Sequence, residues 1–185
     1  MLFLVQISPG FATPLFYYQT NTLRFGREFI GDLAVVSGVL GLAGAVIYGW
    51  ICPKFSLRTL LAGGIVLGAA STLLYLGYLS WKAAIVIEGA AGFTGTLAQL
   101  PLFDLAARAT PAGDEAMGYA LMMSMWNVGA SLSDLFGSWL FEHYRLNFMN
   151  LVWLNAGTTA LVLVVVPLLP RAIVGLREGE TAEAS

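Results

Sequence analysis

The stretch TPLFYYQTNTLRFGREFIG (residues 13–31) is partly repeated later in the chain as LPLFDLAARATPAGDEAMG (residues 100–118). Sliding the sequence by 87 positions gives seven identities over 24 aligned positions, where chance would give about one or two. The matched residues are Pro14, Leu15, Phe16, Gly26, Glu28, Gly31 and Ser37 over Pro101, Leu102, Phe103, Gly113, Glu115, Gly118 and Ser124. The chain therefore contains an internal repeat, and its meaning depends on what lies between the two copies.

The composition is that of a protein that lies in a membrane. Hydrophobic residues make up 58% of the 185 residues and charged residues only 11%, and the mean hydropathy of +0.77 lies well above that of ordinary soluble domains. The lysines and arginines are scattered, so the chain offers no basic patch for nucleic acid. A single cysteine, Cys52, excludes an internal disulfide and a cysteine metal cluster.

Six windows are long and apolar enough to cross a bilayer, which takes about 20 residues per helix. They cover about residues 2–22, 29–51, 57–79, 82–107, 116–140 and 148–169, joined by short loops. The sequence therefore predicts an all-α membrane protein, with six transmembrane helices within residues 1–170 and a polar tail at residues 171–185.

The repeat and the spans together predict the architecture. An offset of 87 residues moves the first span onto the fourth and the start of the second onto the fifth, so the repeating unit is three helices. An odd number of spans inverts the second copy, and such three-plus-three inverted repeats build each half of facilitator-type transporters. The third window holds no acidic or basic residue beyond Arg58 at its start, and the sixth holds none, so we expect these two to face lipid while the other four line a cavity.

Polar side chains inside the windows are the candidate functional groups, because they are costly in a bilayer. Asn127 and Asp134 belong to one polar stripe of the fifth window, and Glu88 and Gln99 share a face of the fourth. Glu88 and Asp134 are the deeper carboxylates and are candidates for a proton-coupling group. Asn127 could equally bond a neighbouring helix or a solute.

Aromatic and charged residues near the window ends have two interpretations each. Tyr17, Tyr18 and Trp126 could stack a planar ligand, although packing or an interfacial belt is the commoner role for any one of them. Asp104 lies near the end of the fourth window, where we expect hydration or pairing with a loop arginine such as Arg108. The sequence contains none of the usual hydrolase, metalloprotease or phosphate-loop motifs, and we expect no enzyme activity, metal or cofactor.

Three segments carry a family resemblance. LPLFDLAARATPAGDEAMGYALMMSMWNVG and the following ASLSDLFGSWL resemble the tenth and eleventh helices of the folate–biopterin transporter family, within the major facilitator superfamily. FYYQTNTLRFGREFIGDL is similar to that family's seventh helix and the loop after it, and YGWICPKFSLRTLL to its eighth-to-ninth loop. The matching residues in the first segment are Pro101, Ala106, Ala107, Arg108, Pro111, Gly113, Glu115, Ser124 and Asn127.

The resemblance implies the C-terminal six-helix half of a secondary transporter in the plasma (inner) membrane. Its solute would be small and polar or anionic, with folate or a pterin as candidates. Proton coupling is expected from the carboxylates inside the apolar windows. The implied partners are the lipid bilayer, the solute, and either an N-terminal six-helix half or a second copy. A non-transporting membrane scaffold or an inactive truncated fragment is the alternative.

The transporter hypothesis also assigns roles to residues. Glu88 and Asp134 are the expected coupling groups. The expected solute-binding residues are Tyr17, Tyr18, Gln19, Asn21, Gln99, Trp126 and Asn127, and the expected residues of the cytoplasmic loops and gate are Lys54, Arg58, Asp104 and Arg108.

Overall fold

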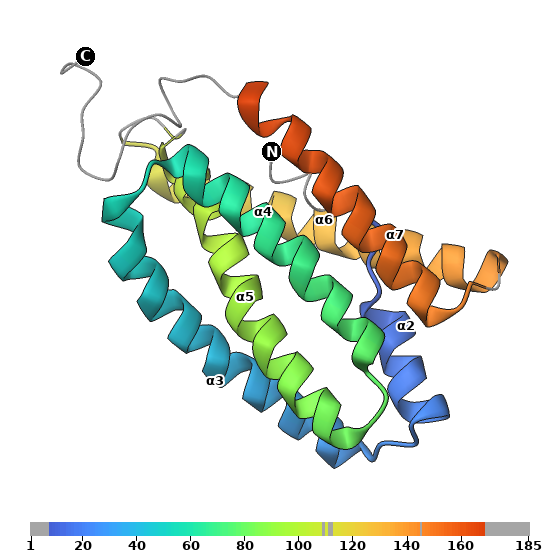
Figure 1. Cartoon of the computed structure of the whole chain (residues 1–185). Coiled ribbons are helices and arrows are strands. Elements are labelled where there is room, and N and C mark those ends of the chain that lie inside the picture. The colour runs from blue at the N-terminus through green and yellow to red at the C-terminus, as the bar shows by residue number, and fades with distance from the viewer. Residues whose placement is uncertain (1–7, 109, 111–112, 145, 169–185) are drawn as a thin grey trace.

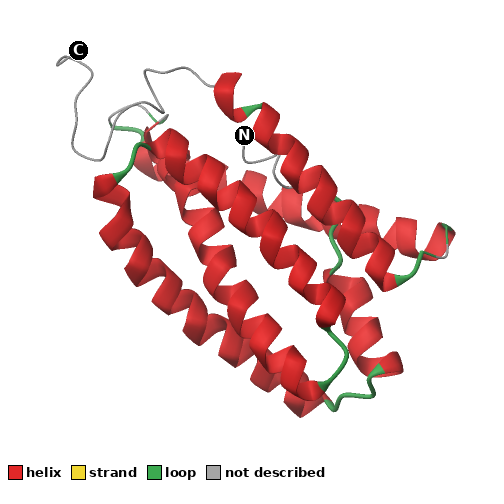
Figure 2. Ribbon diagram, in the orientation of Figure 1, coloured by secondary structure: helices red, strands yellow, loops and turns green. Residues whose placement is uncertain are grey.

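The computed structural model describes residues 8–108, 110, 113–144 and 146–168, and its regular structure in these ranges is entirely helical (Figures 1 and 2). The predicted all-α class is therefore confirmed. The main helices are α2 (Ala12–Tyr17), α3 (Arg27–Ile51), α4 (Leu57–Leu74), α5 (Trp81–Arg108), α6 (Glu115–His143) and α7 (Phe148–Leu161). A π-helical turn at Tyr18–Thr22 extends α2, and short 3-10 turns follow α3, α4 and α7.

Three stretches are long and apolar enough to cross a membrane, namely Arg27–Lys54, Leu57–Gly77 and Trp81–Arg108. The stretch Phe148–Val164 is apolar but shorter. With the composition of the chain, these helices make it an integral membrane protein. The polar tail expected at residues 171–185 lies outside the described residues.

The first window differs from the expected helix over residues 2–22. Residues 1–7 lie outside the described part of the chain, residues 8–11 are not helical, and the helix begins only at Ala12. Pro9 has no backbone N–H to donate and Gly10 is a poor helix former, so the backbone here leaves the helical path. Its hydrogen bonds go to other helices instead, as shown below.

The ends of α3, α4 and α5 coincide with a proline and with serine caps in the sequence. Helix α3 gives way to a 3-10 turn at Cys52–Lys54, which contains Pro53. The Ser56 hydroxyl then caps α4 by accepting the N–H of Thr59 at 3.4 Å. The Ser80 hydroxyl accepts the N–H of Ala83 at 3.3 Å at the start of α5.

Helices α3, α5, α4 and α7 lie side by side in that order (Figure 1), each packed against its neighbour. Helix α6 packs against α2, α5 and α7. The α3–α5 contact is close because it uses small residues, as is common in membranes. A Cβ atom added at Gly92 would lie 2.1 Å from the carbonyl oxygen of Ser37, whereas one at Gly95 would meet nothing within 4 Å.

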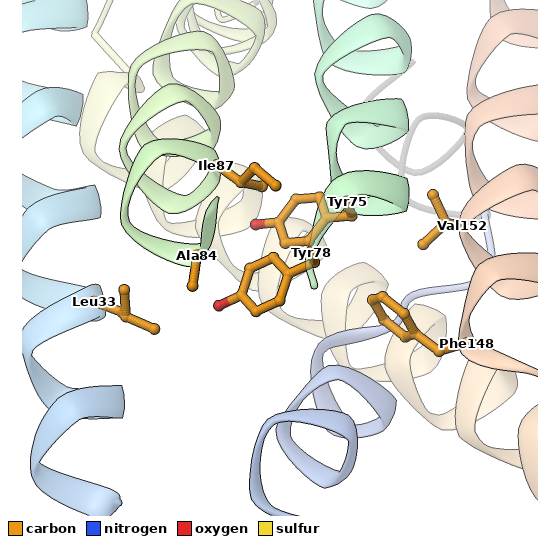
Figure 3. Packing of buried hydrophobic residues seen from close by; sticks show 7 residues of the cluster. All are labelled: Leu33, Tyr75, Tyr78, Ala84, Ile87, Phe148 and Val152. Atoms are coloured by element: carbon orange, nitrogen blue, oxygen red, sulfur yellow. The ribbon is translucent and has the colours of Figure 1, made fainter. Parts of the chain in front are cut away.

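Both copies of the repeated proline are fully buried, Pro14 in α2 and Pro101 within α5. The repeat thus pairs α2 with the second half of α5, and the start of α3 with the start of α6. One buried cluster lies where α3, α5, α7 and the end of α4 meet (Figure 3). It comprises Leu33, Tyr75, Tyr78, Ala84, Ile87, Phe148 and Val152.

Candidate solute and coupling site

The Glu88 carboxylate on α5 accepts hydrogen bonds from two tyrosines at the end of α4. The Tyr75 hydroxyl donates to Oε2 at 3.2 Å and the Tyr78 hydroxyl to Oε1 at 3.1 Å. The Gln19 amide, from the π-helical turn after α2, donates to the Tyr78 hydroxyl oxygen at 2.6 Å. We call these four residues, Gln19, Tyr75, Tyr78 and Glu88, the Glu88 cluster. It joins the π-helical turn after α2 to the end of α4 and to α5, and Gln19 and Tyr78 are 59 positions apart in the sequence.

The end of α4 positions the two tyrosines. Tyr75 begins the 3-10 turn that follows α4, and Tyr78 lies directly after that turn. Their rings stack with centroids 5.6 Å apart and planes 8° apart, and both hydroxyls point toward α5 (Figure 3). Tyr78 is 0% exposed, Gln19 5% and Tyr75 8%, while Glu88 is half-buried, so the polar atoms of the three buried residues depend on partners within the cluster.

This bonding pattern is sensitive to protonation of Glu88. An ionised carboxylate only accepts hydrogen bonds, and here both of its oxygens accept one from a hydroxyl. A proton on Glu88 would turn one oxygen into a donor that faces a tyrosine hydroxyl which is itself donating. A proton on Oε1 would make the Tyr78 hydroxyl turn to accept from it, and this change would reach Gln19, which donates to the same hydroxyl.

The π-helical turn at Tyr18–Thr22 sets the directions of the neighbouring side chains. Gln19 is buried in the Glu88 cluster, while Tyr17 and Asn21 on either side of it are exposed. Such π-turns occur frequently at functional sites, because the wider turn redirects side chains. Here the turn sends Gln19 inward and leaves Asn21 facing a pocket.

That pocket has a volume of about 580 Å³ and lies between the π-helical turn, the end of α6 and the start of α7. Its volume falls within the range of about 300–1,000 Å³ for small-molecule sites. Aromatic rings and polar side chains line it together, including Tyr17, Tyr18, Asn21, Thr22, Glu142 and Asn147. We call it the π-turn pocket. Its mixture of flat apolar surface and a few polar groups suits a planar polar solute.

The two tyrosines of the π-turn pocket differ in what their rings already contact. Tyr18 stacks on Phe148 of α7, with ring centroids 4.8 Å apart and planes 12° apart, so one of its faces is occupied. The Tyr17 side chain is 49% exposed, and its one ring contact among the described residues is edge-on with Phe16, with centroids 6.3 Å apart. Tyr17 is therefore the ring better placed to stack a solute.

Asp134, the other expected coupling carboxylate, lies at the start of α2. Its Oδ1 accepts the backbone N–H of Thr13 at 3.0 Å and its Oδ2 the Thr13 hydroxyl at 2.5 Å. The first N–H groups of a helix have no partner inside it, and an acidic side chain is favourable there. Asp134 thus caps α2 from a different helix.

Residues 8–11 are held next to this cap by α6 and α7. The Ser133 carbonyl accepts the N–H of Gly10 at 2.8 Å, and the Ser133 hydroxyl donates to the Ser8 carbonyl at 2.5 Å. From α7, the Asn155 amide donates to the Pro9 carbonyl at 2.8 Å. These bonds satisfy backbone groups that the broken helix leaves free, as a low-dielectric environment requires.

The remaining expected solute-binding residues lie on α5 and α6, outside the residues that line the π-turn pocket. Trp126 meets the ring of Phe103 edge-on at 5.4 Å, Asn127 is exposed on α6, and Gln99 is half-buried on α5. The structure therefore gathers Tyr17, Tyr18 and Asn21 at one pocket and leaves the other three apart from it. Gln19 connects that pocket to Glu88.

The expected pairing of Asp104 with Arg108 is present. Nε and Nη2 of Arg108 each lie 3.0 Å from an oxygen of Asp104, one turn earlier on α5. The Cys52 thiol lies 3.8 Å from the same carboxylate, so this ion pair connects the end of α5 to the end of α3. Lys54 is exposed, and Arg58 lines a groove on α4. Nothing in these contacts tests a gating role.

The sequence prediction missed the partners that define these sites, namely Tyr75, Tyr78, Ser133 and Asn155. Tyr75 and Tyr78 are three residues apart at the end of an apolar window, a spacing that places two side chains on one side of a helix. That spacing was the available signal. Ser133 and Asn155 had none, because their partners are backbone atoms made available by a break in the first window.

Comparison with known proteins places this chain in a family. The BT1 family model matches residues 1–180. The chain is 29% identical to a folate-biopterin transporter of Synechocystis over 91% of its own length and 37% of that protein. It is 32% identical to probable folate-biopterin transporter 4 of Arabidopsis thaliana over 71% of its length and 29% of that protein. It is 27% identical to folate transporter 2 of Plasmodium falciparum over 98% of its length and 44% of that protein.

These comparisons agree with the class defined by the structure, an all-helical integral membrane protein with buried polar clusters between its helices. The chain belongs to the BT1 family. It spans less than half the length of each of these curated relatives. No solved structure matches it.

Proposed function

We propose that this chain is the C-terminal six-helix half of a proton-coupled secondary transporter for a folate-like or pterin-like solute. Membership of the BT1 family and the printed names of the relatives support the solute class. The three-helix repeat supports the facilitator architecture. An N-terminal half, in the same polypeptide or in another, or a second copy of this chain, supplies the other wall of the cavity.

The Glu88 cluster is the observation that carries the coupling proposal. Among the described carboxylates, Glu88 combines a position within an apolar helix with bonds to two tyrosine hydroxyls. Proton uptake adds an O–H donor to this acceptor-only carboxylate, and a proton on Oε1 would turn the Tyr78 hydroxyl to which Gln19 donates. Because Gln19 belongs to the π-helical turn, the change reaches the wall of the π-turn pocket.

The two candidate carboxylates take different roles in this proposal. Asp134 holds the start of α2 through Thr13, so its ionised form stabilises the packing of α2 on α6. Glu88 holds no helix terminus, and its partners are hydroxyl groups that can rotate. We therefore assign coupling to Glu88 and a structural role to Asp134.

The solute binds in the π-turn pocket in this proposal. Tyr17 stacks the planar ring, while Asn21 and Asn147 offer amide donors and acceptors to its polar edge. Gln99, Trp126 and Asn127 are the candidates for contacts that form when the other half closes the cavity. The membrane is proposed to be the plasma or inner membrane.

Transport by a chimera tests this function. The chimera replaces the matching segment of the Synechocystis transporter by this chain, and uptake of radiolabelled folate and pterin is measured in proteoliposomes with and without an inward proton gradient. We expect gradient-stimulated uptake. Glu88→Gln should keep solute binding and lose the stimulation, while the matched control Asp32→Asn, an exposed carboxylate on α3, should keep both.

A folded chimera that reaches the membrane but takes up neither solute would contradict the proposed function and favour a non-transporting scaffold. Stimulation that persists in Glu88→Gln would contradict the coupling assignment alone. The chain without the other half should show no uptake unless a second copy replaces it.

A further inference from the structure

A groove of about 680 Å³ runs along α4 beside the end of α7. Ala62, Gly63, Val66 and Ala70 of α4 form one wall, and Leu163 and Val166 form the other. We call it the α4–α7 groove. It lies between the two segments that we expect to face lipid, whose windows contain no acidic or basic residue other than Arg58 at the start of α4.

The α4–α7 groove has the length of an acyl chain. Arg58, Ala62, Val66 and Ala70 follow one another at intervals of four residues and so lie along one side of α4. Ala70 is twelve residues after Arg58, which corresponds to about 18 Å of helix. One leaflet of a bilayer provides about 15 Å of hydrocarbon. A chain that follows the groove therefore reaches from the membrane surface to its middle.

The wall of the groove leaves room for such a chain. A Cβ atom built on Gly63 meets no atom within 4 Å, and the Val66 side chain beside it is 53% exposed. The residues beyond the first turn of α4 that line the groove offer no polar side chain among those described. The groove accepts hydrocarbon and offers nothing there to a polar solute.

Arg58 supplies the charge at one end. Among the described residues that line the groove it is the sole charged side chain, and it is partly exposed. It lies in the first turn of α4, which contains no acidic residue. A cation at a helix N-terminus is unfavourable, because that end already carries partial positive charge. A phosphate beside Arg58 would satisfy both the guanidinium and the N-terminus of α4.

We propose that the α4–α7 groove binds an anionic phospholipid, with one acyl chain along Ala62, Val66 and Ala70 and the phosphate at Arg58. The proposal is independent of the solute and of the transport function. It adds a lipid site that is separate from the groups assigned above, since no residue of the Glu88 cluster or the π-turn pocket lines the groove.

Native mass spectrometry of the purified chain, loaded with an equimolar mixture of phosphatidylglycerol and phosphatidylcholine, measures the headgroup preference. We expect Arg58→Gln to lower bound phosphatidylglycerol relative to phosphatidylcholine by about fivefold. Lys54→Gln is the matched control, because it removes an exposed charge near the same end of α4 without touching the groove. If the two variants lowered bound phosphatidylglycerol equally, the headgroup preference would reflect general attraction of anionic lipid to a positively charged surface. That result would overturn the proposal.

A photoreactive phosphatidylglycerol with a diazirine on its acyl chain tests the groove itself. We expect cross-links to Val66 and Leu163, and loss of these cross-links in Gly63→Leu, whose side chain fills the groove. Gly38→Leu on α3 is the matched control, because a Cβ atom there also meets nothing within 4 Å. Unchanged cross-linking in Gly63→Leu would overturn the proposal.

A photoreactive amino acid in place of Gly63 identifies the occupant independently. Cross-links to lipid support the proposal. Cross-links to residues 169–185 of the chain, or to a second copy, would show that protein fills the groove and would overturn it.

Discussion

Asp134 on α6 caps α2 through Thr13, 121 positions earlier in the chain. One carboxylate oxygen accepts the Thr13 N–H at 3.0 Å and the other accepts the Thr13 hydroxyl at 2.5 Å. Close by, a Cβ atom at Gly137 would lie 1.7 Å from the carbonyl oxygen of Gly10. The non-helical segment at residues 8–11 therefore crosses α6 at a glycine and is followed by a helix whose first turn is held by α6.

Replacing Asp134 should destabilise the protein through this cap. We expect Asp134→Ala to lower the free energy of unfolding by about 0.5–2 kcal/mol, the usual effect of losing a helix cap. Unfolding by SDS in mixed micelles, followed by circular dichroism, measures the change. Asp32→Ala, an exposed aspartate on α3, is the control. Equal stability of the two variants would mean that the bonds to Thr13 contribute nothing net.

The two tyrosines of the Glu88 cluster should contribute unequally to stability. Tyr78→Phe removes a hydroxyl that accepts from Gln19 and donates to Glu88, so the buried Gln19 amide and one oxygen of the half-buried Glu88 both lose a bond. Tyr75→Phe leaves only one oxygen of Glu88 without its bond. We expect a loss of about 1–3 kcal/mol for Tyr78→Phe and about half of that for Tyr75→Phe.

The same unfolding measurement ranks these variants. Tyr119→Phe serves as the control, because the Tyr119 side chain is 62% exposed on α6. If Tyr75→Phe were the more damaging change, the bond from Gln19 would have little energetic weight, and the link from the π-turn pocket to Glu88 would lose its support.

Composition and hydropathy were sufficient to predict the long helices α3 and α4. The expected windows at 29–51 and 57–79 correspond to α3 and to α4 with its 3-10 turn, Leu57–Gly77, because the bilayer demands long apolar runs that are visible in the sequence. The first window was predicted less well. Hydropathy averages over Pro9 and Gly10, and the cost of breaking a helix there is offset by partners on α6 and α7 that no local pattern reveals.

The candidate site was predictable only residue by residue. Polarity inside an apolar window singled out Glu88 and Asp134, because a carboxylate there is expensive wherever it points. Which of them caps a helix and which meets hydroxyl groups depends on tertiary contacts with Thr13 and Tyr78. The sequence also predicted the same solute-binding role for Gln19 and Asn21, whereas the π-helical turn buries Gln19 and exposes Asn21.

The α3–α5 contact should be sensitive to a single methyl group. Gly92→Ala brings its Cβ against the Ser37 carbonyl, 2.1 Å away, so the two backbones must separate. We expect a loss of at least about 1–3 kcal/mol in the free energy of unfolding, or failure to fold. Gly95→Ala, three residues later on the same helix, meets nothing within 4 Å and should be neutral or stabilising by up to about 1 kcal/mol. Similar values for both variants would contradict the close contact.

The π-turn pocket should bind a pterin through Tyr17. Its ring is 49% exposed and lines the pocket, so it can stack on a planar solute without first breaking a stacked contact with another ring. We expect Tyr17→Ala to raise the dissociation constant by about three- to tenfold, since a stacked aromatic pair contributes about 0.5–1.5 kcal/mol beyond its buried area. Intrinsic pterin fluorescence, titrated with the purified chain in nanodiscs, gives the constant. Tyr119→Ala removes an exposed tyrosine that does not line this pocket and should leave binding unchanged. An equal loss in the two variants would indicate nonspecific adsorption and would remove the pocket as the solute site, while leaving the Glu88 cluster to be tested by transport.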